Sequence, residues 1–117
     1  MGDISVHFNR SEFACSCGCG FDTVDVELIG CLQTLRNHFN SPVTINSACR
    51  CPSYNVTVGG ALNSQHPLGR AADIVVKKFQ PSVVQDYLKV AHPGKFGIGV
   101  YDTFTHFDTR TNGPARW

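Results

Sequence analysis

Apolar residues recur at intervals of three and four in two stretches of the chain, which is the spacing of one face of an α-helix. The first stretch covers residues 24–39, and its shared face carries Leu28, Cys31, Leu32, Leu35 and Phe39. The second covers residues 81–91, and its face carries Val83, Val84, Tyr87, Leu88 and Ala91. Pro42 and the pair Pro93-Gly94 follow the two stretches and end them. The pattern therefore predicts two amphipathic helices. Residues 52–58 could form a third, short helix that the pair Gly59-Gly60 stops.

Four other segments have the composition of β-strands, because they are short and rich in β-branched and aromatic residues. They are residues 43–47, 71–76, 97–101 and 104–109. The last two form a hairpin or one bent strand around Asp102-Thr103. These elements predict an α+β fold with a small, mainly antiparallel sheet and with the helices on one of its faces.

The length of 117 residues fits a single domain over residues 1–117. Apolar residues make up 42% of the chain and charged residues 16%, which is typical of a globular domain. No apolar run reaches the roughly 20 residues of a membrane span. The net charge of +1, without a basic cluster, argues against a nucleic-acid partner. A chain this small is expected to work as a monomer.

Candidate chemistry lies in two segments that are distant in the sequence. His66 precedes a turn, and Asp73 follows it in the segment predicted as a strand. His106 belongs to the last predicted strand, where alternation places it on the same face as Phe104 and Asp108. If the pairing continues through the turn, Asp102 joins that face too.

Two imidazoles and one carboxylate are the ligand set of a catalytic zinc, which leaves the fourth position for water. Such a zinc lowers the pKa of its water to about 7 and polarises a carbonyl, so it serves hydrolysis. We therefore expect a small zinc hydrolase with His66, Asp73 and His106 as the metal ligands. The metal cleft would open on the sheet face that the helices leave uncovered.

The chain resembles the M15 family of zinc peptidases, which includes D-alanyl-D-alanine carboxypeptidases and phage peptidoglycan endopeptidases. It is most similar to the short, single-domain branch of that family. The motifs that carry the resemblance include FNRSEFAC at 8–15, SQHPLGRAAD at 64–73, HFDTR at 106–110 and ARW at 115–117. Residues 43–50, 58–61 and 97–101, together with Asn55, add to it.

The resemblance implies zinc bound by His66, Asp73 and His106, and a peptidoglycan peptide as the substrate. Arg50 would lie near the substrate carbonyl or terminal carboxylate, while Ser64 and Gln65 would line the cleft. A guanidinium suits that place, because it is always charged and can hold a carboxylate or an oxyanion with two hydrogen bonds.

The general base is where the chain departs from the family. Several relatives carry Glu or Asp three residues before the last ligand, but position 103 is Thr. Asp108 is the favoured base and Asp102 the alternative, since a base must reach the attacking water. Asp108 could equally be a carboxylate that orients His106 by accepting its second ring N–H.

The same three ligands are compatible with two other interpretations of the protein's function. A non-catalytic zinc-binding module would use the same scaffold, as in the related hedgehog signalling domain. A non-haem iron oxygenase would use two histidines and one carboxylate. Those enzymes commonly have His-x-Asp first with the other His downstream, whereas no His follows Asp108 here.

Six cysteines gather in the first half of the chain, at positions 15, 17, 19, 31, 49 and 51. Reduced buried thiols, disulfides and a second zinc site are all compatible with this spacing. Residues 1–7 lack the pattern of a secretory signal. We therefore expect synthesis in the cytoplasm and action on the cell wall, with the chain encoded by a phage or prophage.

Overall fold

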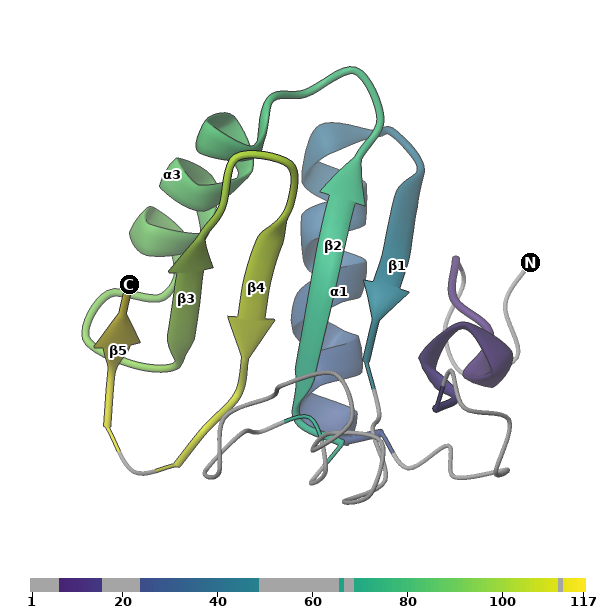
Figure 1. The fold of residues 1–117 in the computed structure, drawn as a ribbon, viewed down its shortest axis with the longest axis horizontal. Helices are drawn as coiled ribbons and strands as arrows, with labels where there is room; N and C mark the ends of the chain where they lie inside the picture. Colours follow the sequence, from purple (N-terminus) through teal and green to yellow (C-terminus); the bar gives the residue numbers. More distant parts are fainter. Residues whose placement is uncertain (1–6, 16–23, 49–65, 67–68, 112) are drawn as a thin grey trace.

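The structure is a computed structural model that describes residues 7–15, 24–48, 66, 69–111 and 113–117. Its elements are η1 (Arg10–Phe13), α1 (Val26–Phe39), β1 (Val43–Ser47), β2 (Ala71–Val76), α3 (Pro81–Ala91), β3 (Gly97–Val100), β4 (Thr105–Asp108) and β5 (Ala115–Arg116). Within these described residues, two α-helices and one five-stranded sheet confirm the predicted α+β fold (Figure 1). The helix expected at residues 52–58 lies outside the described residues.

The sheet has the strand order β1-β2-β4-β3-β5. Neighbouring strands are antiparallel except for β3 and β5, which run parallel. The sequence predicted the first four of these strands, with β3 and β4 slightly longer than they are. It did not predict β5 or the 3-10 helix η1, because elements this short carry no periodic pattern.

Both amphipathic helices have local signals at their ends. Asp25 caps α1, since its side chain accepts a hydrogen bond from the Leu28 amide, so this helix begins two residues later than expected. Asn40 ends α1 in the left-handed conformation, and Pro81 opens α3. In the part of the chain that the structure describes, no helix is long and apolar enough to cross a membrane.

The two faces of the sheet differ in chemistry. Figure 1 shows α1 and α3 together on one face. The core between the helices and this face includes Leu28, Leu32, Leu35, Ile74, Val84, Leu88, Ile98 and Phe107. Side chains alternate along a strand, so Asp73, His106 and Asp108 point to the opposite face. The packing of the helices thus leaves the uncovered face for polar side chains.

We predict that Leu32→Ala lowers the free energy of unfolding by about 2–5 kcal/mol, because Leu32 is fully buried beneath the sheet. Val26→Ala on the same helix is the matched control, since Val26 is 81% exposed. Its effect should stay within about 0.5 kcal/mol. Urea unfolding followed by circular dichroism measures both. Equal losses in the two variants would contradict this packing.

Candidate metal centre

The register of the sheet brings the candidate ligands together. Asp73 on β2 lies directly opposite His106 on β4. On the other side of β4, Gly99 lies opposite His106 and Gly97 opposite Asp108. Two ligands from distant parts of the sequence are therefore cross-strand neighbours, and two glycines on β3 leave space beside them.

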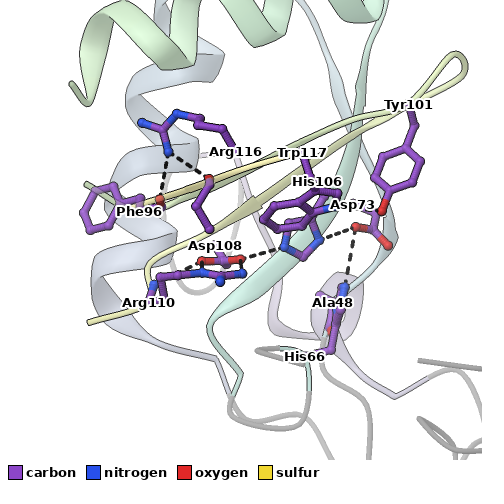
Figure 2. Close-up of polar contacts among 11 residues, drawn as sticks. Ala48, His66, Asp73, Phe96, Tyr101, His106, Asp108, Arg110, Arg116 and Trp117 are labelled. Carbon is purple, nitrogen blue, oxygen red and sulfur yellow. Dashed lines mark hydrogen bonds and ion pairs between the residues drawn. The ribbon is translucent and has the colours of Figure 1, made fainter. Parts of the chain in front are cut away.

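His66, Asp73 and His106 form a buried group whose ligand atoms all lie within 4.8 Å of one another. The Asp73 Oδ1 atom lies 2.9 Å from His106 Nδ1 and 3.5 Å from His66 Nε2 (Figure 2). Two nitrogen donors and one oxygen donor at these separations could hold a divalent transition metal. The structure thus brings together the three residues that the sequence singled out.

A hydrogen bond to the main chain determines which ring nitrogen of His66 carries a proton. Its Nδ1 atom lies 2.5 Å from the carbonyl oxygen of Ala48, and a carbonyl can only accept. Nδ1 therefore carries the proton and donates a hydrogen bond to the Ala48 carbonyl. In the neutral ring the lone pair is then on Nε2, the nitrogen on the side of Asp73. This tautomer suits metal binding through Nε2.

His106 lies between two carboxylates. Its Nε2 atom is 2.7 Å from Asp108 Oδ2, while its Nδ1 atom faces Asp73. Without a metal, both nitrogens can donate, which favours the protonated ring. A neutral ring that keeps Nε2–H on Asp108 would present the Nδ1 lone pair on the side of Asp73. Metal-bound histidines commonly have this kind of carboxylate partner.

Asp108 is itself held by Arg110. The Arg110 guanidinium donates to both carboxylate oxygens, with Nε 2.8 Å from Oδ1 and Nη2 2.7 Å from Oδ2. The Arg110 main-chain amide also donates to Oδ1 at 3.2 Å. Asp108 is 0% exposed, so these groups and His106 replace the water that it lost on burial.

The electrostatics of the face follow from these contacts. Burial alone would raise the pKa of Asp73, but the hydrogen bond from His106 and the nearby His66 side chain outweigh it and hold this pKa well below its ordinary value. Burial likewise opposes ionisation of Asp108, yet Arg110 and His106 keep its pKa low. For His106, burial lowers the pKa, while Asp108 and Asp73 together raise it above its ordinary value. Both carboxylates are therefore ionised.

The other residues that the sequence assigned to the site do not lie in the buried group that the structure describes. Asp102 is exposed in the loop between β3 and β4, apart from the buried group. Arg50, Ser64 and Gln65 lie outside the described residues. No role for Arg110 was predicted from the sequence, because Arg110 lies two residues beyond the end of β4, where alternation no longer fixes the direction of a side chain.

Among the cysteines, Cys15 is buried, and Cys31 is a partly buried free thiol. The other four lie outside the described residues.

Gly97 is required by this arrangement. A Cβ atom built on Gly97 would overlap the Asp108 carboxylate, which Arg110 and His106 hold in place. We predict that Gly97→Ala displaces Asp108, lowers the free energy of unfolding, and weakens metal affinity by about 10–100-fold. Competition with a chelating dye measures the affinity.

Gly30→Ala is the matched control for Gly97→Ala. Gly30 is an exposed position within α1, and a Cβ there would meet nothing within 4 Å. This substitution should stabilise the protein by about 0.5–1 kcal/mol and leave metal affinity unchanged. Wild-type metal affinity in Gly97→Ala would show that the position of Asp108 does not matter for the metal.

Comparison with known proteins agrees with this geometry. No curated protein matches the chain. A family model described as Peptidase M15 matches residues 6–108, which is most of the chain and includes His66, Asp73, His106 and Asp108. M15 peptidases depend on a metal. The buried group of two histidines and one aspartate could hold such a metal. The chain belongs to the peptidase M15 family.

Proposed function

We propose that the protein is a zinc-dependent peptidase that hydrolyses peptide bonds in the stem or cross-link of peptidoglycan. The observation that carries the proposal is the buried group His66, Asp73 and His106 in a chain of a peptidase family. The substrate class rests on the resemblance to the short, peptidoglycan-cleaving branch. The protein would act as a monomer on the cell wall.

Zinc bound by His66, Asp73 and His106 would supply a water of lowered pKa and polarise the scissile carbonyl. The chain's own residues prepare this chemistry. Ala48 keeps the proton of His66 on Nδ1, and Asp108 accepts a hydrogen bond from the Nε2–H of His106. In the proposed mechanism, Arg50 stabilises the negative charge that develops on the carbonyl oxygen.

For Asp108 we propose a positioning role rather than that of the general base. Its two oxygens already accept hydrogen bonds from His106 and Arg110, and the carboxylate is fully buried. A base needs hydrogen-bond reach to the attacking water, directly or through one water. The contacts of Asp108 instead support the orientation of His106.

The proposed activity predicts products from purified peptidoglycan incubated with zinc-loaded protein and analysed by mass spectrometry. Loss of a terminal D-Ala would identify a carboxypeptidase, and cleavage within the stem or cross-bridge an endopeptidase. His66→Ala should lose both zinc and activity, because it removes one of three ligands. His38→Ala is the matched control, since His38 is exposed and stacks on Tyr87.

Three results would argue against the proposed activity. No product despite stoichiometric zinc would favour the non-catalytic binding module. Activity that a chelator leaves intact would contradict a metal-dependent mechanism. Activity restored to the metal-free protein by ferrous iron but not by zinc would contradict the choice of metal.

Asp108→Asn separates the two roles of this carboxylate. If Asp108 positions His106, the variant should bind zinc about 10–100-fold more weakly, because the ionised acceptor and its pairing with Arg110 are lost. Restored occupancy at high zinc should then recover much of the rate. Wild-type zinc affinity with a lost rate would instead assign the general base to Asp108.

A further inference from the structure

An aromatic side chain lies against the candidate metal centre. The Trp117 indole is 5.0 Å from the His106 ring, measured between ring centroids, with 47° between the planes (Figure 2). It also covers Gly99, where a Cβ atom would come within 2.8 Å of the indole. Despite these contacts, Trp117 remains 45% exposed. The residue therefore presents aromatic surface beside a candidate ligand.

The main chain holds Trp117 in this place. Its amide donates to the Ile98 carbonyl at 3.2 Å, and its carbonyl accepts from the Val100 amide at 2.6 Å. The two residues directly before Trp117 form β5, which pairs with β3 in parallel. The position of the indole over Gly99 thus follows from strand pairing.

The Arg116 side chain also holds β5 in place through hydrogen bonds. Its guanidinium donates to four main-chain carbonyls, those of His92, Lys95, Phe96 and Ala115, at 2.8–3.1 Å. Together with the strand pairing, the bonds to His92, Lys95 and Phe96 anchor β5 without help from the indole. Trp117 is therefore not needed as the apolar anchor of this segment.

Polar contacts at the ring edge and over the ring orient the indole. Its Nε1–H donates to the Tyr101 hydroxyl at 3.0 Å, and the Arg110 guanidinium lies 5.1 Å from the ring. Tyr101 is also exposed and stacks on Phe104, with 4.4 Å between ring centroids. Trp117 is thus a rigid, half-exposed aromatic surface, which gives contact area at low cost in conformational entropy.

We propose that Trp117 forms a wall of the substrate site, against which the peptide chain next to the scissile bond packs its aliphatic groups. This inference rests on the proposed peptidase function, because the wall is defined by its distance from the ligand His106. Its role is in substrate binding: it contributes to KM and leaves the metal in place.

The test compares steady-state cleavage of soluble muropeptides by the zinc-loaded wild type and Trp117→Ala. We expect KM to rise by about tenfold or more, in the range that lost apolar contacts produce. Zinc affinity and the free energy of unfolding are measured alongside, and zinc affinity should stay within about twofold. Trp117→Phe should restore part of the loss. Val90→Ala is the control, since Val90 is an 81% exposed apolar residue on α3.

The chain contains a single tryptophan, so its fluorescence reports on this site alone. Muropeptides should shift or quench the emission of the zinc-loaded wild type in a saturable manner, with the same dependence on concentration as cleavage. Quenching that does not saturate would contradict contact with the substrate.

The outcomes separate this inference from the function on which it rests. Cleavage by Trp117→Ala with the wild-type KM would overturn the wall and leave the peptidase intact. Loss of zinc from that variant, together with its activity, would make Trp117 a support for His106 instead. No cleavage by the wild type would overturn the proposed function and the wall with it.

Discussion

The antiparallel pairing of β2 with β4 is the constraint on which the candidate site depends. It sets Asp73 opposite His106 on the face that the helices leave uncovered. Because side chains alternate along a strand, a slip by one residue would turn His106 toward the core and bring Phe107 out. The apolar face against α1 and α3 opposes such a slip, so the packing of the core also fixes the geometry of the metal ligands.

Burial of charge is the second requirement of this face. Asp73 and Asp108 are ionised and buried, with His106 between them and Arg110 beyond. Removal of one partner from such a row leaves an uncompensated buried charge, which is costly. A bound dication would add positive charge near Asp73 while Arg110 continues to neutralise Asp108. Metal binding and the stability of the folded sheet should therefore be coupled.

The sequence predicted those features that depend on local patterns. Apolar periodicity and end signals gave both helices, and alternation correctly put His106 and Asp108 on one face. The need for glycine at positions 97 and 99 could not be predicted in this way, because it arises from β3 pairing with β4. The site of Trp117 likewise depends on β5, a strand of two residues. Contacts set by the order of strands are not encoded in any short motif.

Nitrogen-15 NMR of the histidine rings in the zinc-loaded protein shows whether the sheet and its hydrogen bonds fix how each histidine meets the metal. We expect His66 to carry its proton on Nδ1 and to bind zinc through Nε2. We expect the reverse for His106, with its proton on Nε2 toward Asp108 and zinc on Nδ1. His106 bound through Nε2, or either ring remote from zinc, would show that these hydrogen bonds do not set the metal ligands.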